Sequence, residues 1–238
     1  MLWYKAWLET RMRFVICLIG ITALSAYNLY RMDHEVTSPV NAAFYNNVIN
    51  RQDGQLAVLW LLAFNLLAMG GLLREKTVGA ASFTLALPFS RARLTIIRMA
   101  MSLAQAMTLL IIPWGAIILM GDIFRNTQSV SQALFHLALL TGGGILLYAI
   151  AFLVSTVIEG EYTAPMASGG ITLAIAFEVG GPSLLHYNPV AFMMGGEFYD
   201  AHAGLLRGPF PWTQIVFFCS LAAPLLFLSV KSTQRREF

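Results

Sequence analysis

The chain alternates between long apolar runs and short polar segments. An α-helix needs about 20 apolar residues to cross the hydrocarbon core of a bilayer, and several runs of this chain approach or exceed that length. The pattern therefore predicts an all-α polytopic membrane protein with six membrane-spanning helices in a single transmembrane domain. The expected spans cover about residues 14–30, 56–73, 94–120, 132–158, 163–177 and 212–230.

Composition supports the same class of protein. Hydrophobic residues make up 58% of the 238 residues and charged residues 11%, whereas soluble domains carry about 25% charged residues. We therefore expect membrane lipid around the chain. Cys17 and Cys219 both fall inside expected spans, so we expect small apolar thiols rather than a disulfide.

The distribution of Lys and Arg predicts the orientation, because positively charged loops stay in the cytoplasm. Three cations precede residue 14, five lie in residues 74–98 and three follow residue 230, so six spans place eleven of the 15 cations on one side. The sequence predicts a multi-pass protein of the cell (inner) membrane with both termini in the cytoplasm. The net charge of +3 does not indicate a nucleic-acid partner, because the cations flank the spans.

Residues 1–13 form an amphipathic segment. In a helix, Trp3 and Trp7 lie on one arc, whereas Lys5 and Glu9 lie on another. We expect an elbow helix on the cytoplasmic surface of the membrane, because Trp side chains suit the headgroup level. A plain cytoplasmic tail is the alternative. A signal peptide is disfavoured, because the apolar stretch that follows serves as the first span.

Two segments rich in glycine each have two interpretations. Residues 178–211 contain short apolar pieces, cut by Gly and Pro, that cannot span. They form either an ordinary outer loop or re-entrant helices before the last span, and the apolar pieces favour re-entry. Gly142, Gly143 and Gly144 lie within the fourth expected span. They form either a hinge or a close packing face, and small residues in membrane helices favour packing.

The chain lacks the motifs of common catalytic and nucleotide sites. It contains no phosphate loop G-x-x-x-x-G-K-[ST], no H-E-x-x-H and no G-x-S-x-G. We expect no catalytic residue, cofactor or metal in this chain, and therefore no enzyme activity. The span interiors carry almost no ionisable groups, which disfavours a transporter driven by protons or sodium ions. Five residues of the outer segment could together bind a metal ion, but we favour the interpretation that they are solvated loop residues. They are Glu178, His186, Glu197, Asp200 and His202.

The most informative stretch is the basic segment, residues 74–98. Five cations accompany a single acid, Glu75, between two apolar spans. Charge alone describes an ordinary cytoplasmic loop. The order of the parts is more specific: a charged start, a helical face with Val78 and Leu85, and then Pro88, which ends the helix.

That order resembles the first cytoplasmic loop of type-2 ABC-transporter permeases. The layout is similar over the whole chain, because these permeases combine an elbow helix, six spans, a coupling helix after span two and re-entrant helices before span six. The chain departs from the family pattern at Ala80-Ala81-Ser82, where Thr-Leu-Glu is common. The matching positions are Arg74-Glu75-Lys76, Gly79, Leu85, Leu87-Pro88, Ser90-Arg91 and Leu94.

The resemblance implies a permease subunit that pairs with a second copy of itself and forms the substrate pathway of an exporter. Two copies of a separate ABC ATPase subunit, which bind ATP and Mg²⁺, would drive it. Residues 74–93 would be the cytoplasmic coupling loop that docks on the ATPase. The coupling residues would be Glu75, Val78, Gly79, Phe83 and Leu85.

Two other classes stay open. A six-span membrane enzyme should show polar catalytic groups at one depth, which the spans lack. A channel or scaffold protein that is not driven by ATP is the other class. The sequence does not identify a substrate or its binding residues, because drugs, peptides, lipids, glycans and haem-related cargo all suit an apolar lining.

Overall fold

The computed structural model describes residues 2–35, 58–69, 90–121, 130–158, 160, 163–177, 187–195, 198–200, 205–206 and 208–235. Their regular structure is helical apart from one short antiparallel ladder, in which Tyr199 pairs with Leu206. The all-α prediction is therefore confirmed. The elements are α1 (Leu2–Glu35), the helix Val58–Ala68, α5 (Arg91–Gly121), α6 (Val130–Val157), α7 (Thr163–Phe177), α8 (Pro189–Met193), β1 (Tyr199–Asp200), β2 (Leu205–Leu206) and α9 (Trp212–Arg235).

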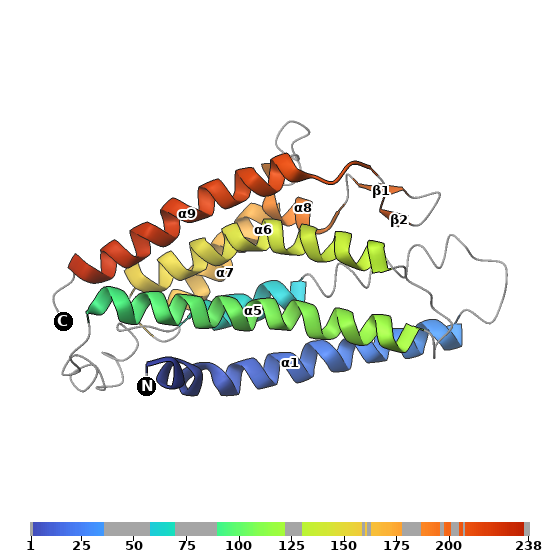
Figure 1. Cartoon of the computed structure of the whole chain (residues 1–238), viewed down its shortest axis with the longest axis horizontal. Coiled ribbons are helices and arrows are strands. Elements are labelled where there is room, and N and C mark those ends of the chain that lie inside the picture. Colours follow the sequence, from blue (N-terminus) through green and yellow to red (C-terminus); the bar gives the residue numbers. More distant parts are fainter. Residues whose placement is uncertain are drawn as a thin grey trace.

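The long helices lie side by side along the longest axis of the molecule (Figure 1). α5 contacts both α1 and α6, and α6 packs against α9. The helix Val58–Ala68 runs antiparallel to α1, because Arg13 bonds to Leu66 near the end of that helix, whereas Ile21 and Trp60 line the same cavity. Both termini lie at one end of the bundle (Figure 1).

Four helices, α1, α5, α6 and α9, are long and apolar enough to cross a membrane. The other two expected spans coincide with shorter apolar helices, Val58–Ala68 and Thr163–Ala176. The 15 residues of α7 extend about 22 Å, whereas a hydrocarbon core is about 30 Å thick. The structure supports a multi-pass membrane protein, and the count of six spans stays a prediction. α1 is one continuous helix from Leu2 to Glu35, without a break after the expected elbow helix at residues 1–13. The elbow helix therefore also stays a prediction.

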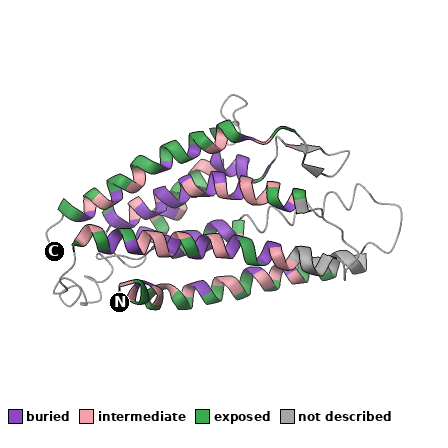
Figure 2. Cartoon of the chain, viewed as in Figure 1, coloured by how far each residue is buried: buried purple, intermediate pink, exposed green. Residues whose placement is uncertain are grey.

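α6 lies at the centre of the bundle. It contacts α5, α7, α8 and α9, and its apolar window is the most buried of the four long helices. Figure 2 shows the buried residues on α6 and on the sides of the helices that face it. The outer sides of α1 and α9 are exposed and apolar, as at Ile16, Ile19 and Phe227. Those sides suit contact with lipid chains.

The three glycines of α6 form a packing face, as the favoured interpretation of the sequence predicts. A Cβ atom at Gly142 would lie 2.9 Å from Cγ1 of Ile215 on α9. At Gly143 it would overlap the main-chain carbonyl of Pro189 in α8, and at Gly144 it would overlap the indole ring of Trp60. Three neighbouring elements therefore approach α6 at consecutive positions that a larger residue would block.

Replacing Gly143 by Ala should destabilise the protein by about 1–3 kcal/mol, the usual cost of overpacking a close contact. The added methyl group meets a main-chain oxygen, which cannot rotate away as a side chain can. Thermal unfolding in detergent would measure the loss. Gly169→Ala in α7 is the matched control, because a Cβ there meets no described atom within 4 Å and Ala favours the helix by about 1 kcal/mol. Equal stability of the two variants would contradict a packing role.

Candidate functional site

The five expected coupling residues lie outside the residues that the structure describes. The same holds for Arg74 and Lys76, at the start of the basic segment. Residues 70–89 are not described, and the structure does describe the two ends that flank them: Met69, after the helix Val58–Ala68, and Ser90, which lies within the basic segment just before α5. The site is therefore built from these flanks. The undescribed coupling residues are Glu75, Val78, Gly79, Phe83 and Leu85.

The flanks lie at the end of the bundle that holds both termini. α1 and α5 begin there and α9 ends there (Figure 1), and each of these helix ends carries Lys or Arg. We call this the basic end. Its described cations are Lys5, Arg11, Arg13, Arg91, Arg93, Arg98, Lys231 and Arg235.

An ion pair joins α1 to α5 at the basic end. Nη2 of Arg98 lies 3.0 Å from Oε2 of Glu9 and donates a hydrogen bond of 3.1 Å to Oε1. Nζ of Lys5, one turn earlier in α1, lies 3.7 Å from the same carboxylate. The Arg98 side chain is only 11% exposed, so Glu9 neutralises a cation that is largely removed from solvent. Such a charge is costly to bury without a partner.

One residue further along α1, a second polar contact reaches α5. Nε2 of Gln105 donates a hydrogen bond of 2.7 Å to Oγ1 of Thr10, and the Thr10 hydroxyl donates to the carbonyl oxygen of Ala6 at 3.0 Å. Gln105 is buried, with 3% of its surface exposed. The side-chain amide of Gln105 can lie in the helix interface because the Thr10 hydroxyl accepts a hydrogen bond from it there.

Arg13 connects α1 to the other flank of the basic segment. Its Nη1 donates to the carbonyl oxygens of Leu66, at 3.2 Å, and Met69, at 2.5 Å. The last carbonyl groups of a helix lack partners within the helix and carry a partial negative charge. A guanidinium group supplies both hydrogen-bond donors for these carbonyl groups and a positive charge. Arg13 therefore caps the C-terminal end of the helix Val58–Ala68.

Further polar contacts hold the neighbouring helices together. The Tyr148 hydroxyl of α6 donates to the Met99 carbonyl oxygen of α5 at 2.9 Å and lies 2.6 Å from Oγ of Ser102. Either hydroxyl could be the donor in the second bond, because Oγ of Ser102 also donates to the Arg98 carbonyl oxygen at 2.9 Å. Oγ of Ser168 in α7 donates to Oδ1 of Asn65 at 2.9 Å. These bonds tie α5 to α6 and α7 to the helix Val58–Ala68.

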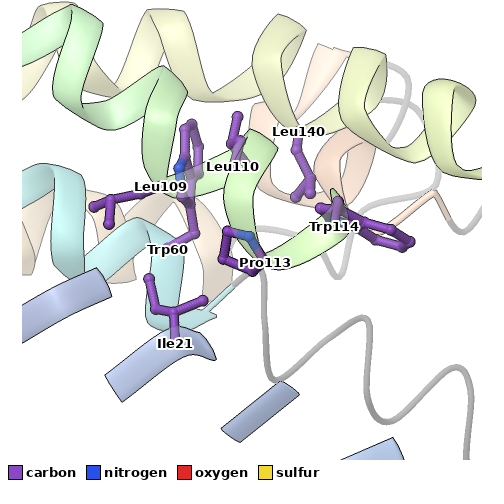
Figure 3. Close-up of a pocket in the computed structure, with 7 residues that line it drawn as sticks. All are labelled: Ile21, Trp60, Leu109, Leu110, Pro113, Trp114 and Leu140. Atoms are coloured by element: carbon purple, nitrogen blue, oxygen red, sulfur yellow. The ribbon is translucent and has the colours of Figure 1, made fainter. Parts of the chain in front are cut away.

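An apolar cavity lies between α1, the helix Val58–Ala68, α5 and α6 (Figure 3). Two of its lining side chains carry an indole N–H, Trp60 and Trp114, and Nε1 of Trp60 bonds to the carbonyl oxygen of Ala106 at 3.1 Å. Apolar cavities of this kind hold neither water nor a polar ligand. The cavity is therefore no site for a charged substrate. Its lining residues are Ile21, Trp60, Leu109, Leu110, Pro113, Trp114 and Leu140.

The described residues contain no group of three or more His, Cys, Asp or Glu that could hold a metal ion. Of the metal candidates named from the sequence, Asp200 belongs to β1, and its side chain is not described. The other four, Glu178, His186, Glu197 and His202, lie outside the described residues. Cys17 in α1 and Cys219 in α9 are free thiols.

The short helix α8, within the expected re-entrant segment, packs deeply against α6. Asn188 caps it, because Oδ1 accepts from the amides of Val190, at 2.9 Å, and Ala191, at 3.2 Å. Nδ2 of Asn188 also donates to the Ile175 carbonyl oxygen of α7 at 2.6 Å. α8 meets α6 at Gly143, 13 residues from the start of α6 and therefore about 20 Å along it.

A cysteine at Met193 should be labelled poorly by an impermeant thiol reagent, because Met193 is 3% exposed and packs into the core. The measurement uses a background without Cys17 and Cys219. Pro209→Cys, in the exposed loop before α9, is the matched control and should label readily. Rapid labelling at both positions would show that α8 leaves the core in the membrane.

No protein-family model, no curated protein and no solved structure matches this chain. A function therefore has to be argued from the residues and their geometry.

Proposed function

We propose that this chain is the membrane-spanning permease subunit of an ATP-driven transporter of the type-2 ABC kind. Two copies of this chain form the substrate pathway in the inner membrane. Two copies of a separate ABC ATPase dock on the basic segment, which lies in the cytoplasm. The direction of transport is export. Glu75, Val78, Gly79, Phe83 and Leu85 make the contact with the ATPase.

The observation that supports this proposal most directly is the position of the two ends that flank the basic segment. Met69 and Ser90 are described, and α1 is bonded to both flanking helices, through Arg13 on one side and through Glu9 and Arg98 on the other. A plain connecting loop needs no such attachment. A segment that receives force from a partner does, because its movement must reach the spans.

Two further features are compatible with the proposal. The termini and eight of the nine described cations gather at one end of the bundle, and Arg31 lies towards the far end of α1. The end with the eight cations is the cytoplasmic end by the charge rule. α8 lies beside the middle of α6, where a re-entrant helix would lie. The side chains of Tyr148, Ser102 and Ser168 inside the bundle bond to other side chains or to main-chain carbonyls.

The experiment that tests the proposal breaks the expected coupling helix. Val78→Pro should cost about 3 kcal/mol or more of local helix stability and should leave insertion of the spans unchanged. The complex purified from native membranes should contain an ATPase with a phosphate loop, and the Val78→Pro variant should lose it. Quantitative mass spectrometry of the purified complex measures the loss.

Val78→Ala is the matched control, because Ala preserves the helix and removes only part of the side chain. It should keep most of the ATPase. Replacing both Arg91 and Arg93 by neutral residues tests the rival view of a plain basic loop. That view predicts that loss of charge changes ATPase recovery and that disruption of the helix does not. Normal ATPase recovery with Val78→Pro would overturn the proposal.

The purified chain alone should hydrolyse no ATP above background, because it has no loop that could hold the phosphate groups. Release of inorganic phosphate from Mg-ATP would be measured with the chain in lipid nanodiscs. A preparation of the Val78→Pro variant controls for contaminating ATPase, since that variant should lose bound partner. Turnover that persists equally in both preparations after stringent purification would assign hydrolysis to this chain.

A further inference from the structure

We propose that Glu9, Thr10 and Arg13 form a clamp that fastens the helix Val58–Ala68 and α5 to α1, so that the two ends flanking the basic segment move as one body. Arg13 positions the C-terminal end of the helix Val58–Ala68. Glu9 and Thr10 position α5 through their contacts with Arg98 and Gln105. The clamp itself rests only on the described contacts. Its use in transport rests on the proposed function.

The three clamp residues lie on one side of α1. At 3.6 residues per turn they fall within an arc of about 100°. Their partners come from different elements: Arg98 and Gln105 on α5, and the carbonyl oxygens of Leu66 and Met69. The first third of α1 is therefore the shared support of two helices that are consecutive in the chain.

The chemistry of each contact suits a firm attachment. The Arg13 guanidinium meets two carbonyl groups at a helix end, where the helix leaves acceptors free. The Glu9–Arg98 pair is partly sheltered from solvent, with the two side chains 33% and 11% exposed. Hydrogen bonds that involve a charged group are worth more than neutral ones. A helix held by apolar packing alone has no comparable restraint on sliding or rotation.

Arg11 provides a matched control for Arg13. It has the same charge, lies two residues away at the same end, and is exposed. It points about 160° away from Arg13 around α1. Loss of either arginine removes one positive charge from the basic end, so any difference between the variants reports the contact rather than the charge.

The test measures the distance between spin labels at Leu62→Cys and Ile96→Cys in a background without Cys17 and Cys219, with the chain in lipid nanodiscs. Both positions are exposed, at 56% and 46%, and they lie on the two clamped helices. Arg13→Ala should broaden the distance distribution, whereas Arg11→Ala should leave it narrow. Arg13→Lys should restore most of the narrow distribution, because an ammonium group can also donate to both carbonyls.

Amide hydrogen exchange gives a second readout that needs no labels. Loss of a charged hydrogen bond at a helix end should speed exchange of the last turn of Val58–Ala68 about tenfold or more in Arg13→Ala. Exchange in the middle of α6 should not change. If Arg13→Ala folds poorly, Glu9→Gln tests the other half of the clamp by the same labels.

An unchanged distance distribution and unchanged exchange in Arg13→Ala would overturn the clamp, as would equal broadening in Arg11→Ala. Neither readout involves an ATPase. The clamp can therefore fail while the proposed transport function stands, and the transport function can fail in the Val78→Pro experiment while the clamp stands.

Discussion

Hydrocarbon offers no hydrogen-bond partners, so each polar group that enters the apolar layer of this bundle has to find one inside the protein. Trp60 bonds to the Ala106 carbonyl, Tyr148 to Met99 and Ser168 to Asn65. Each bond joins two different helices. The same contacts therefore give a buried polar group its hydrogen-bond partner and hold two helices together. Two buried oxygens, Oγ1 of Thr22 and Oε1 of Gln105, lack a partner among the described residues.

Close packing supplements these bonds where no polar group is available. Lipid chains are as apolar as leucine, so helices in a membrane associate by close fit rather than by hydrophobic burial. The glycines of α6 let α9, α8 and Trp60 approach the same stretch from different directions. α8 depends on this approach, because its five residues are too few to form a stable helix alone. Its fixed position follows from the small residues opposite it and from the Asn188 cap.

Much of the helical layout could be predicted from the sequence, because a membrane imposes a length and a composition on each span. α1, α5, α6 and α9 coincide with expected spans, and the glycine packing face was the favoured of two interpretations because small residues in membrane helices mostly mark packing faces. The clamp was not predicted. Thr10 and Arg13 belong to the amphipathic segment, residues 1–13, and Gln105 is a single polar residue inside the expected span 94–120. Nothing in the pattern pairs positions 95 residues apart. The expected coupling residues were named by resemblance, and the described residues do not reach them.

α5 is the element through which these constraints combine. Pro113 lies within it and removes the main-chain bond that would reach the carbonyl of Leu109. The contacts of Arg98, Ser102, Gln105 and the Ala106 carbonyl all lie on the Arg91 side of that proline. Beyond it, Trp114 stacks on His136 at 5.1 Å between ring centres. The half of α5 next to the basic segment is thus fastened to α1, the helix Val58–Ala68 and α6. A displacement that enters at Arg91 would therefore act on these helices together, because their contacts with this half of α5 all precede Pro113.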